Sequence, residues 1–222
     1  MVTTPRCAAV ARPPMGNVSH NRAMTGLGDA LTSALRGHPA VRAVHLVGSR
    51  QRGAPGPLSD WDFAVAVTDF AAVAAALPGL LMPLAPLAQQ WDPLSRHRTY
   101  MLVLPGPVKV DLLFDEPQLS APPWEVRADT LRAIDGHFWD WVYWLASKHV
   151  AGGHTRVAQE FAKLAHHVLR PLGAHFVPDT IEEAIAIYVA ARADAELRLG
   201  ETVPRELEGE IRHGLQRVGH NV

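Results

Sequence analysis

Asp60 and Asp62 are the residues whose type and spacing point most directly to chemistry. They begin the apolar run Asp-Trp-Asp-Phe-Ala-Val-Ala-Val over residues 60–67, which has the composition of a β-strand. Residues two apart in a strand point to the same face, so the two carboxylates lie side by side. Like charges at that separation repel each other and need a counter-charge. A divalent cation that prefers hard oxygen ligands, Mg²⁺ above all, is the simplest one.

A second chemical signal lies just before this run. An apolar stretch over residues 41–47 ends in Gly48-Ser49, and a loop rich in glycine and proline connects it to Asp60. A turn of this type can hold phosphate oxygens with its backbone N–H groups. Phosphate and Mg²⁺ in one pocket indicate nucleotide chemistry.

Asp111 is a lone carboxylate in the middle of another apolar run, residues 108–114. This run and residues 100–104 flank Pro105-Gly106-Pro107, which predicts a β-hairpin. If the strands of Asp62 and Asp111 are neighbours, three carboxylates converge on one sheet face. Such a set can hold two cations about 3.5–4 Å apart for phosphoryl transfer. Asp111 can also accept the proton of an attacking hydroxyl.

The combination of these motifs resembles a known family. Val47-Gly48-Ser49, ten intervening residues and Asp60-Trp61-Asp62-Phe63 resemble the signature of the DNA polymerase β nucleotidyltransferase superfamily. Residues 48–53, Gly-Ser-Arg-Gln-Arg-Gly, are similar to the Gly-Ser-x-Ala-Arg-Gly variant of small bacterial members, with Gln51 in place of the usual alanine. Residues 108–114 resemble the strand that carries the third carboxylate. The resemblance covers about residues 26–116, and its specificity comes from the motifs occurring together.

The resemblance implies a role for each of these residues. Asp60, Asp62 and Asp111 would be the catalytic residues and the ligands of two Mg²⁺ ions. Gly48 and Ser49 would hold the β- and γ-phosphates of an NTP, with ATP favoured. Arg50 and Arg52 lie in the same loop and are both candidate phosphate contacts, and Arg52 is included among the expected nucleotide-binding residues.

The second half of the chain has the periodicity of helices. We expect four of them, over residues 135–150, 155–169, 180–200 and 205–217. The first is unusually aromatic and places Asp140, Trp144 and Lys148 on one face. Helical domains of small antibiotic-type nucleotidyltransferases look similar, which implies that Lys148 reaches the triphosphate. The alternative is a solvated Lys148 on a helix whose apolar face fills the core.

The order of elements predicts an α+β fold, in which a small mixed β-sheet nucleotidyltransferase domain with flanking helices precedes an all-helical bundle domain. We expect a disordered N-terminal tail, a nucleotidyltransferase domain and a C-terminal helical domain at residues 1–24, 25–118 and 119–222. Asp69 is expected to cap a helix that ends at Ala76, and Asp135 and Thr180 are expected to cap the helices that begin with them. The apolar stretch 70–88 contains three prolines and a glycine, so we interpret it as a short helix and a buried loop, not as a membrane span.

Composition limits the possible partners. The chain has 222 residues, 21 Lys and Arg against 22 Asp and Glu, a formal net charge of −1 and a sequence pI of about 6.9. No global field therefore attracts nucleic acid or an anionic membrane, and we expect neither as a partner. The single cysteine excludes a disulfide framework and a cysteine-based zinc site. Together with the absence of a convincing signal peptide, it predicts a cytoplasmic protein.

The sequence therefore predicts a Mg²⁺-dependent nucleotidyltransferase that moves an NMP, AMP from ATP, to a hydroxyl of a small molecule and releases pyrophosphate. An aminoglycoside-like acceptor, with antibiotic resistance as the corresponding role, is one hypothesis. The acidic residues that would surround such a cationic acceptor are Asp115, Glu116, Asp135 and Asp140. Two alternatives stay open: a protein adenylyltransferase of the antitoxin type, and a non-catalytic nucleotide-binding module. Whether the protein is a monomer or a homodimer is left open.

Overall fold

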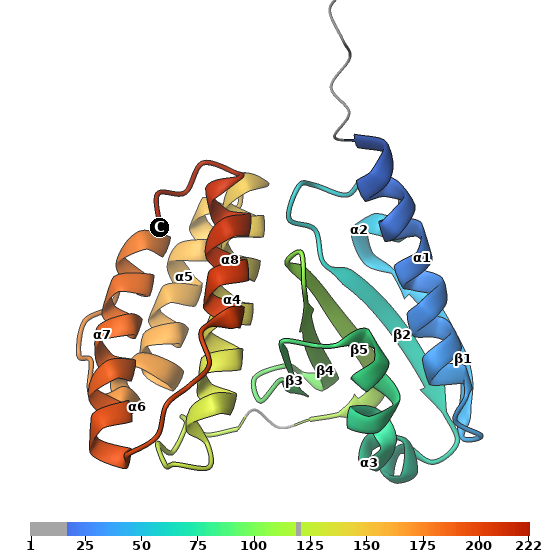
Figure 1. Ribbon diagram of the computed structural model, residues 1–222, viewed down its shortest axis with the longest axis horizontal. Coiled ribbons are helices and arrows are strands. Elements are labelled where there is room, and N and C mark those ends of the chain that lie inside the picture. Colours follow the sequence, from blue (N-terminus) through green and yellow to red (C-terminus); the bar gives the residue numbers. More distant parts are fainter. Residues whose placement is uncertain (1–16, 119–120) are drawn as a thin grey trace, which may run out of the picture.

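The computed structural model describes residues 17–118 and 121–222. Its N-terminal half consists of a five-stranded mixed sheet with helices on one side (Figure 1). The strands are β1 (Val41–Val47), β2 (Trp61–Val67), β3 (Ala88–Trp91), β4 (His97–Leu104) and β5 (Val108–Pro117). The helical elements of this half are α1 (Asn17–Arg36), the short α2 (Gly48–Gln51), α3 (Phe70–Leu81) and the 3₁₀ turn η1 (Met82–Leu84).

The pairing of the strands places the candidate carboxylates next to each other. The order across the sheet is β1-β2-β5-β4-β3. Strands β2 and β5 are parallel, whereas the other neighbouring pairs are antiparallel. In the parallel pair Asp62 is directly opposite Asp111, so both side chains lie on the same face of the sheet. The expected hairpin is confirmed as β4 and β5, joined by residues 105–107.

Alternation along the strands divides the sheet into an apolar face and a face with polar residues. Phe63 and Val65 of β2 and Leu112 of β5 are buried in a hydrophobic cluster with residues of α1 and α3. The helical members of this cluster are Leu31, Leu35, Val73, Leu77 and Leu81. Burial of these side chains holds α1 and α3 against the sheet. The opposite face, which carries Asp62 and Asp111, is left for the second half of the chain.

The C-terminal half is helical and lies beside the sheet (Figure 1). Its elements are α4 (Leu131–Val150), α5 (His154–Leu164), the π-helical turn η2 (Ala165–Leu169), α6 (Arg170–Leu172), α7 (Ile181–Leu199) and α8 (Glu206–Gln216). They share a second hydrophobic cluster, to which the loop residue Leu58 and the β4 residue Val103 also belong. Within the two described ranges, no helix is both long and apolar enough to cross a membrane.

The turn between β4 and β5 fixes one half against the other. The Tyr143 hydroxyl donates a hydrogen bond of 3.2 Å to the carbonyl of Pro107. The backbone N–H of Gly106 donates to Glu210 Oε2 at 3.1 Å. A Cβ atom on Gly214 would lie only 2.5 Å from Pro107 Cγ, so the turn and α8 are in close contact. The position of α4 and α8 beside the polar sheet face therefore depends on this turn.

Several sequence-based expectations about helix ends need correction. Helix α1 already begins at Asn17, so residues 17–24 are helical and not disordered; residues 1–16 of the expected tail lie outside the described part. Helix α3 continues through Pro78 to Leu81 and does not end at Ala76. The apolar stretch 70–88 ends at the first residue of strand β3, a strand that the sequence pattern does not predict.

Capping residues were predicted with mixed success. Asp69 caps α3 by accepting a hydrogen bond from Ala72 N, and Thr180 caps α7 by accepting one from Glu183 N, as expected. Asp135 is not a cap, because α4 begins four residues earlier at Leu131. Asp135 is buried and accepts hydrogen bonds from Trp139, Tyr188 and Arg192 instead.

We predict that Gly214→Ala destabilises the protein, whereas Gly209→Ala in the same helix does not. The new methyl group at residue 214 collides with Pro107, and overpacking of this kind costs about 1–3 kcal/mol. No atom lies within 4 Å of a Cβ at residue 209, where alanine should stabilise the helix by up to about 1 kcal/mol. Urea unfolding of both variants measures the difference. Equal stability of the two variants would contradict the close contact between α8 and the turn.

Candidate active site

Three carboxylates meet on the polar face of the sheet. Asp60 precedes β2, Asp62 lies within β2, and Asp111 lies in β5. Each offers one carboxylate oxygen, and these three oxygens all lie within 4.8 Å of one another. Among the described residues this is the only group of three or more acidic, histidine or cysteine side chains with ligand atoms so close together. The expected convergence of the three side chains is therefore present.

Gly48 and Ser49 lie at the same end of β2. Gly48 has a φ of +71°, and a Cβ atom there would be 2.0 Å from Asp62 Oδ2. Only glycine lets the backbone approach the carboxylate this closely. Ser49 Oγ is buried and has no hydrogen-bond partner in the structure. A buried hydroxyl of this kind is costly unless a ligand or water bonds to it, which makes it a candidate contact for a bound group.

A cavity of about 500 Å³ connects the carboxylates with basic side chains from both halves. Its walls include the three aspartates, Gly48, Ser49, Arg52, Trp144, Lys148 and Arg156. Lys148 Nζ is 4.0 Å from Asp60 Oδ2. The volume is within the range of about 300–1,000 Å³ that is usual for small-molecule sites. The four predicted nucleotide-binding residues thus share one cavity with the three aspartates.

Trp144 contacts two of the basic side chains that line the cavity. Lys148 Nζ lies 5.2 Å from the centre of the indole ring, and the guanidinium of Arg156 lies 4.9 Å from it. Cation–π contacts of this length hold both groups near the ring face. Arg156 was not singled out from the sequence, because nothing in the local pattern of α5 distinguishes it from a solvated helix residue.

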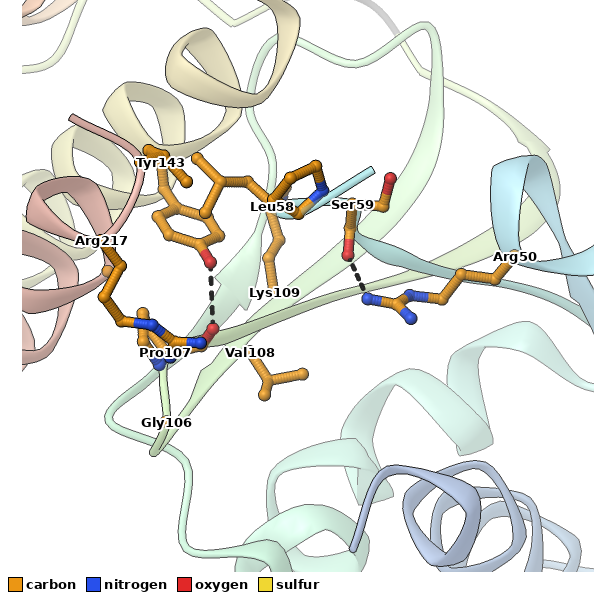
Figure 2. A pocket seen from close by; sticks show the side chains of 12 residues that line it. Arg50, Leu58, Ser59, Gly106, Pro107, Val108, Lys109, Tyr143 and Arg217 are labelled. Carbon is orange, nitrogen blue, oxygen red and sulfur yellow. Dashed lines mark hydrogen bonds between the residues drawn. The ribbon is translucent and has the colours of Figure 1, made fainter. Parts of the chain in front are cut away.

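Arg50 takes a structural position beside the site (Figure 2). Its Nη2 donates to the Ser59 carbonyl at 2.6 Å, its Nε donates to the Asp60 carbonyl at 2.9 Å, and its guanidinium lies 4.4 Å from the centre of the Trp61 ring. A small cavity of about 130 Å³ separates it from Tyr143 and Arg217 of the helical half. Arg50 therefore holds the end of the loop that leads to Asp60.

The electrostatics of the cluster favour a bound cation. Burial, together with the neighbouring charges of Asp60 and Asp111, raises the pKa of Asp62 to about 6. Burial is the larger cause of this rise, and the uncompensated negative charge of the neighbouring carboxylates adds to it. A divalent cation would compensate it and would favour the ionised form of all three side chains.

Lys109 is a buried cation beside the cluster that sequence reasoning did not assign to the site. Its Nζ lies 2.7 Å from Asp111 Oδ1 and 2.7 Å from Asp140 Oδ1 of α4. Burial alone would lower the pKa of Lys109, but the carboxylates of Asp111 and Asp140 outweigh burial and raise it. The ammonium is therefore charged. The sequence signal was the placement of Lys109 two residues before Asp111, on the same face of β5.

The hypothesis of four acidic residues around a cationic acceptor is wrong for two of them. Asp140 is buried and its Oδ1 accepts a hydrogen bond from Lys109, while Asp135 is buried in a salt bridge with Arg192 at 2.8 Å. Both charges are neutralised inside the protein and are not offered to a ligand. Asp115 and Glu116 are exposed at the end of β5, outside the cavity lining.

Comparison with known proteins finds only weak structural similarity. No protein-family model matches this chain, and no curated protein sequence matches it. It is similar to the solved structure of a non-canonical poly(A) polymerase complex, with 18% identity and a TM-score of 0.37, over 59% of this chain and 44% of that one. A cytoplasmic RNA terminal U-transferase is 15% identical with a TM-score of 0.34, over 79% of this chain and 65% of that one.

An aminoglycoside 6-adenyltransferase from Bacillus subtilis is 12% identical with a TM-score of 0.28, over 88% of this chain and 96% of that one. The chain thus spans less than two thirds of the length of the first two proteins. At these identities and TM-scores the comparisons carry no argument about this chain, and the chemistry of the site rests on its own geometry.

Proposed function

We propose that this protein is a nucleotidyltransferase that moves the NMP group of an NTP, AMP from ATP, to a hydroxyl of a small molecule. The attacking oxygen forms a bond to the α-phosphorus, and the bond from that phosphorus to the leaving pyrophosphate breaks. The hydroxyl passes its proton to a base, a role that Asp111 can fill. The observation that carries the proposal is the convergence of Asp60, Asp62 and Asp111 beside Gly48 and Ser49, in one cavity with basic side chains.

The donor set fits Mg²⁺. Three carboxylate oxygens within 4.8 Å of one another are hard ligands for this ion, and the glycine at residue 48 keeps the space beside Asp62 free of a side chain. Bound Mg²⁺ would neutralise phosphate charge and make the attacking hydroxyl more acidic. Asp60, Asp62 and Asp111 are the residues that we assign to hold it.

The chain's other residues bind and orient the nucleotide in this proposal. Ser49 Oγ, which has no partner within the protein, donates to a phosphate oxygen. Arg52, Lys148 and Arg156 face the same cavity and neutralise the triphosphate from both halves. Positive charge fixed before the substrate arrives stabilises the charge that develops during transfer, and positioning lowers the barrier further.

Replacement of either strand carboxylate is expected to abolish turnover while the fold survives. Asp60→Asn and Asp62→Asn each remove a charged ligand from a cluster that has excess negative charge, so stability should not fall. Pyrophosphate release with ATP, Mg²⁺ and an acceptor should drop by about 100-fold or more. Thermal unfolding of the same samples checks the fold.

Asp194→Asn, a change on the exposed face of α7, is the matched control and should leave turnover unchanged. Near-normal activity of Asp60→Asn or Asp62→Asn would remove the metal assignment from these residues.

The cations of the helical half should affect nucleotide binding more than the chemical step. Lys148→Gln and Arg156→Gln each remove one charged contact to phosphate, worth about 1.5–3 kcal/mol, so the KM for ATP should rise about 10-fold or more. Steady-state kinetics at saturating acceptor measure KM and kcat separately. Arg170→Gln, an exposed change outside the cavity lining, is the control. An unchanged KM in both variants would mean that the triphosphate lies elsewhere.

A direct screen of candidate compounds identifies the acceptor. Purified protein is incubated with ATP and Mg²⁺ and with aminoglycosides, lincosamides or nucleosides in turn, and pyrophosphate release is recorded. We expect release with at least one hydroxyl compound. Label transferred from ATP to a protein would favour the protein adenylyltransferase instead. Binding of ATP without release on every acceptor would favour a non-catalytic nucleotide-binding module.

A further inference from the structure

A buried chain of charges connects the candidate metal site to the helical half. Lys109 of β5 lies between Asp111 of the same strand and Asp140 of α4, with both N–O distances at 2.7 Å. The Lys109 side chain is 5% exposed and that of Asp140 is 9% exposed. Across the described ranges, these two carboxylates are the only ones within 4.0 Å of the Lys109 ammonium.

Packing alone does not explain a lysine at this position. Val110 and Leu112, on the opposite face of β5, are fully buried apolar side chains, so burial in this strand does not by itself require a charge. A buried ion pair is often no more stable than an apolar pair of similar volume, because both charges lose their hydration. A fully satisfied buried network does, however, restrict each member to one orientation. The network is therefore better explained by the orientation that it gives to its members than by added stability.

We propose that Lys109 and Asp140 are positioning residues for Asp111. This inference rests on the proposed function, in which Asp111 holds a metal ion. The Lys109 ammonium holds Asp111 Oδ1, so the carboxylate cannot rotate freely, and its remaining lone pairs keep one direction relative to Asp60 and Asp62. Asp140 acts only through Lys109. Its carboxylate accepts a hydrogen bond from the Lys109 ammonium and so holds that ammonium in place from the helical half.

This relay, from Asp140 through Lys109 to Asp111, makes the metal site depend on the contact between the two halves. Asp140 lies on α4, two turns before Lys148, so the helix that brings a cation to the cavity also orients a ligand on the sheet. Asp140 also neutralises Lys109. Without it, a buried positive charge would remain on Asp111 and would oppose a bound cation.

Three variants and one control test the relay. Asp140→Asn removes the anchor, and the double variant Lys109→Met/Asp140→Asn removes the relay while keeping its net charge at zero. Lys109→Arg keeps a donor that can reach both carboxylates. Glu208→Gln breaks a different buried ion pair of the helical half, with Arg192 at 2.6 Å, and controls for loss of stability alone.

Mn²⁺ binding, followed by its electron paramagnetic resonance signal, is the first measurement, because it does not require turnover. We expect both Asp140→Asn and the double variant to bind Mn²⁺ about 10-fold more weakly. In pyrophosphate release their kcat should fall while the KM for ATP changes little. Lys109→Arg, which keeps a charged donor, should bind Mn²⁺ more tightly than either of these variants. Glu208→Gln should lower the unfolding temperature without changing Mn²⁺ affinity.

Two results would overturn the relay. One is Mn²⁺ affinity within twofold of the original protein in folded Asp140→Asn and in the double variant. The other is a crystal structure of the double variant in which the Asp111 carboxylate keeps its orientation toward Asp60 and Asp62. The crystal structure decides the inference even if the original protein binds no Mn²⁺, a result that would count against the proposed function itself.

Discussion

The concentration of negative charge on one face of a small sheet is the constraint on which the rest of the structure depends. Three carboxylate oxygens lie within 4.8 Å of one another in a partly buried site, and the pKa of Asp62 rises to about 6 because burial and its neighbours disfavour its ionised form. Lys109 supplies a charge that Asp111 shares with Asp140 inside the protein, and Lys148 supplies another at 4.0 Å from Asp60. Cations must compensate the negative charge of the site, and these two lysines provide part of that compensation.

Backbone geometry brings these charges together. The parallel pairing of β2 with β5 places Asp62 opposite Asp111, and the left-handed φ of Gly48 lets the preceding turn pass close to Asp62. Arg50 holds the loop before β2 through the carbonyls of Ser59 and Asp60. An arginine that looked like a phosphate contact in the sequence thus stabilises the loop that carries the first carboxylate.

The two halves contribute different parts of the cavity. The sheet supplies the carboxylates and the glycine-serine turn, whereas α4 and α5 supply Trp144, Lys148 and Arg156. Close contacts of the β4–β5 turn with α4 and α8 hold the halves in place. The turn is therefore one of the contacts that hold the two walls of the cavity against each other.

Local patterns in the sequence predicted those features that depend on neighbours along the chain. The bounds of β1 match the expected residues 41–47, and Asp69 and Thr180 cap helices as expected, because strand alternation and capping need only a few adjacent residues. Asp135 has the same local appearance as a cap. Its partners Tyr188 and Arg192 are more than 50 residues away, and burial among them decides its role.

The sequence by itself determined that Asp60 and Asp62 share a face, that a glycine-serine turn precedes them, and that Asp111 lies in a separate apolar strand. It could not determine that these strands are neighbours, nor that Lys109 is buried between Asp111 and a carboxylate of α4. Spacing along a strand sets the direction of side chains within that strand only. The packing of distant elements decides which faces meet, and that packing is the sum of many weak contacts spread over the whole chain.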